Sequence, residues 1–192
     1  EEFQIEQPRA FSEEVHSVII MFGGTDPANL NRKIYRSLLK YAPRHPAIRF
    51  SFITGVGYDY EAHGVVTRED CNIFVHPNVP RVSKYMKEAD LAITSQGRAI
   101  FELAAMGVPA IVLSQNRREQ THRFAQMANG FINLGMGEEV EQSMIENTLD
   151  WLIHTPSVRR NMHELLLQYP LREGVERVRD IILGRGGRTY GV

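Results

Sequence analysis

The sequence predicts an α/β fold, a Rossmann-like doubly wound parallel sheet with additional helices at the C-terminus. Short apolar runs of four to six residues recur between residues 18 and 134. They do not alternate with polar residues, which is typical of strands buried on both faces. Segments with the 3.6-residue spacing of amphipathic helices separate these runs. Alternation of this kind implies right-handed crossovers and a parallel sheet.

The expected strands are the apolar runs at residues 18–22, 50–53, 73–76, 91–94 and 110–113, with a weaker run at 131–134. The expected helices between them cover residues 29–41, 82–89, 98–106 and 119–129. Asp26 is a candidate N-cap for the first helix, and Gly130 is expected to end the fourth. Beyond residue 143 the strands stop, and helices are expected at 144–154, 158–168 and 175–183. Residues 55–70 have no clear period, so either a marginal helix or a mobile loop fits them.

The sequence divides into three parts. Residues 1–15 are polar, contain a proline and lack an initiator methionine. We expect them to be a linker left from a missing upstream domain, although an arbitrary end of the sequence would look the same. Residues 16–183 form the predicted domain, and residues 184–192, which contain four glycines, are expected to be a flexible tail.

The composition limits the class of protein. Hydrophobic residues make up 43% and charged residues 23% of the chain, and the formal net charge is −1. These values fit a globular protein and give no electrostatic reason to expect a nucleic acid or an anionic membrane as partner. The single cysteine excludes an internal disulfide. With no transmembrane-length apolar run and no signal-peptide pattern, we expect a cytoplasmic protein.

The first candidate binding stretch is MFGGTDPANL, residues 21–30. In parallel sheets, ligands bind beyond the carboxyl ends of the strands. Gly23 and Gly24 would let the backbone approach a ligand closely, and the next helix would offer free N–H donors to an anion. The stretch has neither the dinucleotide pattern G-x-G-x-x-G nor a Walker loop, so NAD is disfavoured. A tight turn capped by Asp26 explains it equally well.

The second candidate is TSQGRAIFELAAMG, residues 94–107. Ser95, Gln96 and Gly97 follow a predicted strand and open a helix, so their amides could hold a phosphate. Glu102 lies about 6 Å further along that helix at 1.5 Å per residue. This separation suits the step from a phosphate to a ribose diol, which a carboxylate can bind through both hydroxyls. A solvated helical glutamate is the competing interpretation.

The third candidate is LSQNRREQTHRF, residues 113–124, which follows the next strand and opens onto the same edge. Gln115 and Asn116 could bind sugar hydroxyls through their amides, and Glu119 and Gln120 are expected to start the following helix. The nearby arginines could provide a positive field, although a solvated helix face explains them too. Three polar turns converging at one edge make a binding site plausible.

The sequence offers no catalytic group and no metal site. The seven histidines show no metal-ligand spacing, and Glu119-x-x-His122 is half of a helical carboxylate motif without a second copy. No G-x-S-x-G elbow occurs. We therefore expect no metal and no cofactor, and the catalytic residues stay unknown.

Two stretches together, GGTDPANL and the block HPNVPRVSKYMKEADLAITSQGRAIFELAAMGVPAIVLSQNRREQTHRFA, resemble the C-terminal half of GT-B nucleotide-sugar enzymes. The resemblance is greatest to the group of the UDP-sugar hydrolase of pseudaminic acid synthesis and of spore-coat polysaccharide proteins. The peptidoglycan N-acetylglucosaminyltransferase is more distant. The resemblance covers residues 18–183 and is most specific at 89–120.

This resemblance implies a role for each candidate residue. It places Glu102 at the ribose hydroxyls and the backbone of Asn78 and Val79 against the uracil edge. Diphosphate contacts would come from Ser95, Gln96 and Gly97, and the interdomain side would be lined by Gly23, Gly24 and Thr25. Gln115 and Gln120 would approach the sugar or phosphate. Relatives often have small residues where this chain has Gln96 and Arg98.

The resemblance also implies a missing half. In the hydrolase, the N-terminal domain supplies a histidine that is thought to activate water, and none of the histidines here matches it. We therefore expect a UDP-sugar-binding domain of a hydrolase or glycosyltransferase of bacterial surface-glycan or nonulosonic-acid biosynthesis, incomplete without its N-terminal domain. A non-catalytic or regulatory nucleotide-binding module, and half of a sugar-nucleotide epimerase, are the alternatives.

Overall fold

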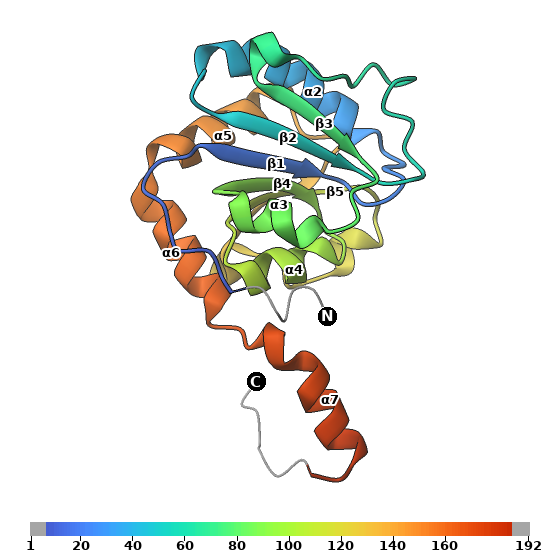
Figure 1. The fold of residues 1–192 in the computed structure, drawn as a ribbon, viewed down its shortest axis with the longest axis vertical. Coiled ribbons are helices and arrows are strands. Elements are labelled where there is room, and N and C mark those ends of the chain that lie inside the picture. The colour runs from blue at the N-terminus through green and yellow to red at the C-terminus, as the bar shows by residue number, and fades with distance from the viewer. Residues whose placement is uncertain (1–6, 186–192) are drawn as a thin grey trace.

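The computed structural model describes residues 7–185, which form one six-stranded sheet with helices on both faces (Figure 1). All neighbouring strands are parallel. The sheet order is β3-β2-β1-β4-β5-β6. The strands are β1 (Ser17–Met21), β2 (Arg49–Thr54), β3 (Ile73–Pro77), β4 (Leu91–Ser95), β5 (Ala110–Ser114) and β6 (Phe131–Met136). The Rossmann-like doubly wound fold is therefore confirmed.

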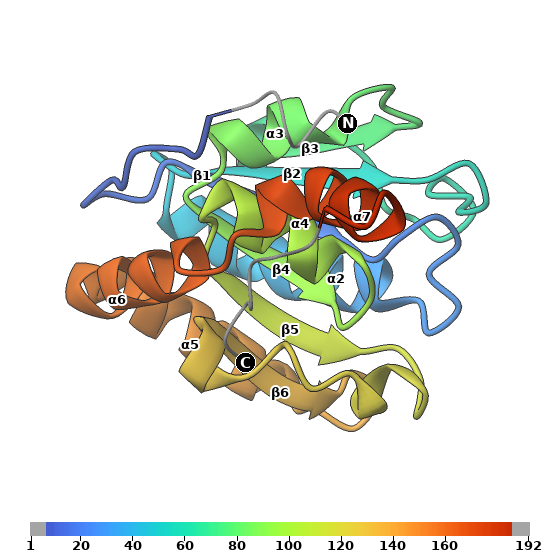
Figure 2. The ribbon, with the colours of Figure 1, turned by 90° about the horizontal axis from the view of Figure 1, so that it is seen from below.

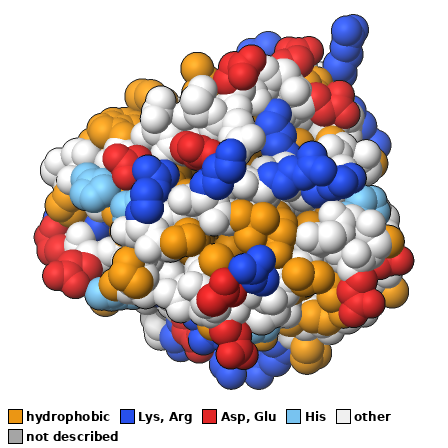
Figure 3. Space-filling model, turned by 90° about the horizontal axis from the view of Figure 1, so that it is seen from above, with side chains coloured by type: hydrophobic (Ala, Val, Ile, Leu, Met, Phe, Trp, Pro, Cys, Tyr) orange, Lys and Arg blue, Asp and Glu red, His pale blue; other side chains and the backbone are white. Residues whose placement is uncertain are grey.

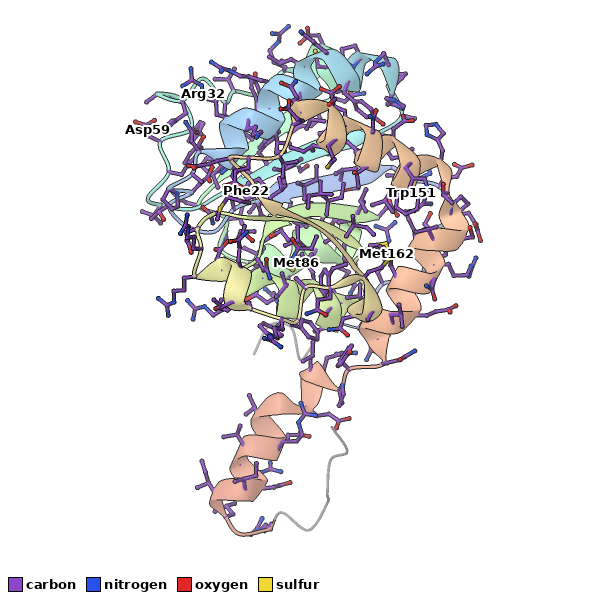
Figure 4. All side chains as sticks on the ribbon, turned by 180° about the vertical axis from the view of Figure 1, so that it is seen from behind. Phe22, Arg32, Asp59, Met86, Trp151 and Met162 are labelled. Atoms are coloured by element: carbon purple, nitrogen blue, oxygen red, sulfur yellow. The ribbon has the colours of Figure 1, made fainter. Side chains whose placement is uncertain are left out.

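Helices pack on both faces of the sheet and form two hydrophobic cores. They are α2 (Leu30–Tyr41), α3 (Val82–Glu88), α4 (Ala99–Met106), α5 (Gln142–His154), α6 (Pro156–Leu167) and α7 (Gly174–Ile182). One core lies between the sheet and helices α2 and α5, and it includes Phe22. The other lies beneath α3 and α4, which are side by side in Figure 2, and it includes Met86. Phe22 and Met86 thus mark opposite sides of the sheet (Figure 4).

The C-terminal helix α7 extends away from the two cores (Figure 1). None of its residues is buried, and its apolar side chains Val178, Ile181 and Ile182 are exposed. No helix within residues 7–185 is long and apolar enough to cross a membrane. Residues 186–192, most of the predicted flexible tail, lie outside the described part of the chain.

One predicted helix is wrong. Residues 119–129 form two short 3-10 turns, Glu119–Thr121 and Met127–Asn129, instead of a continuous helix. Polar side chains in this segment bond to the backbone: Thr121 Oγ1 donates to the Arg118 carbonyl, and Asn129 Nδ2 donates to that of Phe124. Such local bonds compete with helical ones. The ambiguous residues 55–70 form a loop that ends in a 3-10 turn, Glu69–Cys71.

Arg159 on α6 hydrogen-bonds both to the end of α5 and to the segment that precedes β1. Its side chain is completely buried within α6. The guanidinium donates to the carbonyl oxygens of Leu152 and Ile153 at the end of α5, at 2.6 and 2.8 Å. It also donates to the carbonyl oxygens of Ser12 and Glu13. One side chain therefore satisfies the C-terminal carbonyls of a helix and positions the irregular segment that leads into β1.

Asp26 caps α2 from one turn upstream. Its two carboxylate oxygens accept hydrogen bonds from the backbone N–H groups of Leu30 and Asn31, at 2.9 and 2.7 Å. Asp26 itself has φ 41°, in the left-handed region. The predicted capping role of Asp26 is thus confirmed, although the residue directly before the helix is Asn29.

Replacing Asp26 with alanine is expected to lower the free energy of unfolding by about 1–2 kcal/mol, the usual cost of losing a helix N-cap. Asp26→Asn keeps one acceptor oxygen and should lose less. Urea denaturation of both variants tests this order. If Asp26→Ala were as stable as the parent chain, the capping bonds would contribute nothing measurable.

Candidate functional site

The strand order changes direction beside β1, which places two candidate loops next to each other. β1 lies between β2 and β4, and the buried Thr94 hydroxyl donates to the Met21 carbonyl oxygen at 2.9 Å. The loop that follows β1 is therefore adjacent to the turn that follows β4. In open parallel sheets this switch point is where ligands bind.

A cavity of about 290 Å³ opens at this edge. Four predicted site residues line it: Gly23, Gly24, Asn78 and Val79. Six further residues that were not among the predicted site residues complete its wall: Met21, Ile53, Thr54, Gly55, Val56 and Val82. Asn78 is held in the left-handed region with φ 51°, and its N–H donates to the Thr54 carbonyl. The cavity is thus bounded by the loops that follow β1, β2 and β3.

Two glycines after β2 let its loop lie directly against the Gly23–Gly24 loop. A Cβ at Gly55 would come 2.4 Å from the Gly24 Cα, and one at Gly57 would come 2.7 Å from the Thr25 methyl. The Gly57 N–H donates to the Gly24 carbonyl at 3.0 Å. The G-V-G spacing directly after a predicted strand was the signal in the sequence that could have revealed this contact.

If the cavity holds the nucleotide that the sequence resemblance implies, replacing Gly55 with alanine is expected to weaken binding by roughly tenfold or more, because the backbone of the Gly23–Gly24 loop must move to avoid the new methyl group. Calorimetric titration with UDP measures the effect. Gly174→Ala is the matched control, since a Cβ there meets nothing within 4 Å and φ is −56°. Equal affinities of the two variants would contradict the role assigned to this contact.

The turn between β4 and α4 contains Ser95, Gln96 and Gly97. Ser95 and Gln96 are each 4% exposed, and Gly97 is half-buried. The side chain of Gln96 faces into the protein, where its oxygen accepts from Ser114 Oγ at 2.7 Å and from Asn133 Nδ2 at 3.0 Å. Its amide nitrogen donates to the His122 carbonyl. Gln96 therefore links the β4–α4 turn to β5, to β6 and to His122, so the polar atoms of its side chain are already hydrogen-bonded within the protein.

Glu102 lies in the first turn of α4 and is half-buried. The helix is otherwise strongly apolar, with Ile100, Leu103 and Ala104 completely buried beneath it. The structure therefore places a carboxylate at the beginning of a helix whose other side packs on the sheet. A negative charge is favourable at such a helix N-terminus.

The segment after β5 closes this edge of the sheet. The Gln115 side-chain amide reaches across β4 and donates to the Phe22 carbonyl at 3.0 Å. Its backbone N–H donates to Glu119 Oε2 at 2.8 Å. Gln120 is exposed within the first 3-10 turn, and Thr25 is exposed beside Gly57. Seven of the eleven predicted residues therefore do not line the cavity.

Four exposed arginines belong to the β4–α4 turn and to the segment that follows β5. Arg98, Arg117, Arg118 and Arg123 are exposed, and none forms an ion pair with any other residue in the range 7–185. The pKa of Asp26, after the Gly23–Gly24 loop, is raised by burial, and the hydrogen bonds from the N–H groups of Asn31 and Leu30 offset only part of that rise. The surface elsewhere is mixed, as Figure 3 shows for one face with basic and acidic side chains interspersed. Local arginines, rather than net charge, thus favour an anion here.

Metal-binding clusters are absent from the described residues, in which no group of three or more His, Cys, Asp or Glu side chains could hold an ion. The single cysteine, Cys71, is free and buried against the α2 side of the sheet. The edge therefore offers hydrogen-bonding and positively charged groups to a ligand, and residues 7–185 contain no metal site.

The parallel sheet and its strand order define a Rossmann-like α/β domain, a fold that solved GT-B glycosyltransferase structures share. The chain belongs to the glycosyltransferase family 28 C-terminal domain family, whose model matches residues 18–177. The family assignment confirms the predicted resemblance to the C-terminal domain of GT-B enzymes.

Individual relatives agree with this assignment. The chain is 24% identical to the spore coat polysaccharide biosynthesis protein SpsG of Bacillus subtilis over 158 residues, covering 79% of the chain and 45% of SpsG. It is 30% identical to the uncharacterized protein MJ1062 of Methanocaldococcus jannaschii over 116 residues, covering 58% of the chain and 23% of that protein. The crystal structure of Acinetobacter baumannii MurG has the same fold, with a TM-score of 0.70 and 16% identity over 95% of the chain and 55% of MurG. The chain thus spans about half or less of the length of the relatives it matches.

Proposed function

We propose that this chain is the donor-binding domain of an enzyme that transfers or releases the sugar of a UDP-sugar. The observation that carries the proposal is the convergence at one sheet edge of the cavity, the β4–α4 turn and Glu102. In this proposal the cavity holds the base, the β4–α4 turn holds the diphosphate and Glu102 holds the ribose. The spore-coat relative SpsG supports a place in polysaccharide biosynthesis.

Each feature suits one part of the ligand. The cavity is lined by the apolar residues Met21, Ile53 and Val82 together with Asn78 and Val79, and we assign the backbone groups of the last two to the edge of a planar base, as the resemblance implies. The amides of the β4–α4 turn and the N-terminus of α4 suit the diphosphate. Glu102 suits the ribose diol, because an ionised carboxylate accepts hydrogen bonds from both hydroxyls.

The chemistry that follows from this arrangement is stabilisation of the leaving group. When the bond between the anomeric carbon and the diphosphate breaks, negative charge develops on the β-phosphate. Amides that already point at that phosphate stabilise this charge without reorganising. The sugar is then taken by an acceptor hydroxyl in a transferase or by water in a hydrolase. We propose that a separate N-terminal domain supplies the acceptor and its base, as the resemblance implies.

Two alternatives stay open to experiment. A non-catalytic nucleotide-binding module would bind the same ligand without turnover when joined to its N-terminal domain. Half of a sugar-nucleotide epimerase would convert one UDP-sugar into another rather than release UDP. An assay of the complete protein for UDP release, with and without candidate hydroxyl acceptors, separates these outcomes from the hydrolase and transferase proposals.

Calorimetric titration with UDP tests the binding proposal directly, with CMP and GDP as controls. We expect UDP to bind and both controls to bind at least about tenfold more weakly, a difference of about 1.4 kcal/mol. Equal binding of all three nucleotides would contradict a base-selective cavity. Failure to bind any nucleotide, in this chain and in the complete protein, would overturn the proposed function.

A further inference from the structure

A reciprocal pair of hydrogen bonds joins His122 to the β4–α4 turn. His122 Nδ1 lies 2.8 Å from the Gln96 carbonyl oxygen, and the Gln96 side-chain amide donates to the His122 carbonyl. Gln96 is 4% exposed and is further held by Ser114 and Asn133. His122 is exposed, so its ring is fixed on one side and accessible on the other. The two segments meet at the turn where the proposed diphosphate would lie.

This bridge fixes which nitrogen of His122 carries the hydrogen. A carbonyl oxygen can only accept, so Nδ1 must be the donor. In the neutral ring, Nε2 then has a lone pair and cannot donate to a phosphate. In the protonated ring, Nε2 carries a hydrogen and becomes a charged donor, which makes a stronger hydrogen bond to phosphate oxygens than a neutral group does.

The charges around His122 give a reason for the ring to be protonated when a diphosphate is bound. Glu119 is on the same segment, and its Oε1 lies 3.5 Å from the position that a Cβ on Gly97 would occupy. A fixed carboxylate beside the turn opposes a bound diphosphate. The other charged groups on these two segments and the first turn of α4 are the half-buried Glu102 and four exposed arginines: Arg98, Arg117, Arg118 and Arg123. His122 is held against the turn itself, so a proton there acts at close range.

We propose that His122 takes up a proton from solvent when a nucleotide diphosphate-sugar binds, and that its Nε2–H then donates to a diphosphate oxygen. The inference rests on the proposed function. It gives His122 a direct contact with the leaving group, and it gives Gln96 the role of positioning His122. The positive charge stays on the ring while UDP departs, so it stabilises the negative charge that develops on the β-phosphate.

Two substitutions separate the ligand contact from the structural bridge. In His122→Asn the side-chain amide nitrogen can replace Nδ1 and keep the bond to Gln96, but nothing replaces Nε2. In His122→Gln the amide nitrogen can reach the Nε2 position without ever being charged. Thermal unfolding of both variants checks that the fold is retained.

The test is calorimetric titration with UDP-glucose, repeated at neutral pH in buffers of different ionisation enthalpy. UDP-glucose is the probe because its diphosphate has no terminal group that titrates near neutrality, so any proton taken up belongs to the protein. We expect proton uptake in the parent chain and its loss in both variants. Affinity for UDP-glucose should fall roughly tenfold or more in His122→Asn, less in His122→Gln, and affinity for uridine should be unchanged.

Each other outcome has a definite meaning. Binding of UDP-glucose without proton uptake overturns the role of His122 and leaves the proposed function intact. Unchanged affinity in His122→Asn does the same, because that variant keeps only the bridge. If the parent chain and the complete protein bind neither UDP-glucose nor uridine, the proposed function fails and this inference fails with it.

Discussion

Replacing Arg159 with alanine is expected to lower the free energy of unfolding by about 3–5 kcal/mol, the largest stability effect of any single substitution considered. The side chain is completely buried and donates to four carbonyl oxygens from two parts of the chain. Alanine leaves these carbonyls without a donor and leaves a cavity as well. Lysine cannot match the planar fork of arginine, so Arg159→Lys should also lose stability, though less.

Arg160 provides the matched control for that experiment. It is the next residue of α6, it is exposed, and its guanidinium pairs with Glu13 at the surface. Exposed pairs of this kind contribute at most about 1 kcal/mol, so Arg160→Ala should change stability little. Urea denaturation followed by the fluorescence of Trp151 on α5 measures both variants. Equal losses at the two positions would show that burial and carbonyl contacts do not set the contribution of Arg159.

The sheet could be predicted from the sequence because parallel strands covered on both faces must be apolar throughout. The run at 110–113 illustrates this, since every residue of β5 is buried. The helix predicted at 119–129 is wrong for a different reason. Its acidic start and Gly130 stop are typical of a helix, but side-chain bonds such as that of Asn129 to the Phe124 carbonyl hold the segment in turns. Periodicity does not reveal such bonds.

The binding edge could be predicted only in part. Gly23 and Gly24 were predicted because they directly follow a parallel strand, and Asn78 and Val79 were predicted from the resemblance to GT-B enzymes; all four line the cavity. The contribution of Gly55 was missed because residues 55–70 have no period to interpret. The inward orientation of Gln96 depends on Ser114 and Asn133, which lie 18 and 37 residues further along the chain. Contacts over such separations are set by the folded sheet, and one sequence does not reveal them.

If Glu102 binds the ribose diol as proposed, replacing it with alanine is expected to weaken UDP binding by about 1–3 kcal/mol, roughly 5- to 150-fold in affinity, because two ribose hydroxyls lose their acceptor. Glu102→Gln keeps one oxygen acceptor and should lose less. Glu164, an exposed glutamate on α6, is the control, and Glu164→Ala should bind UDP as the parent chain does. Calorimetric titration measures all four proteins.

The ligand itself offers a second test of Glu102. If its carboxylate binds the ribose diol, 2′-deoxy-UDP should bind the parent chain more weakly than UDP does, whereas Glu102→Ala should hardly distinguish the two nucleotides. This double comparison isolates the contact between the carboxylate and the 2′-hydroxyl, since a general disturbance of α4 would weaken both nucleotides equally. Equal loss of UDP and 2′-deoxy-UDP in Glu102→Ala, with discrimination between them retained, would assign the ribose to another residue. Because α4 is held on the sheet by Ile100, Leu103 and Ala104, all buried beneath it, the helix itself should not move when Glu102 is shortened.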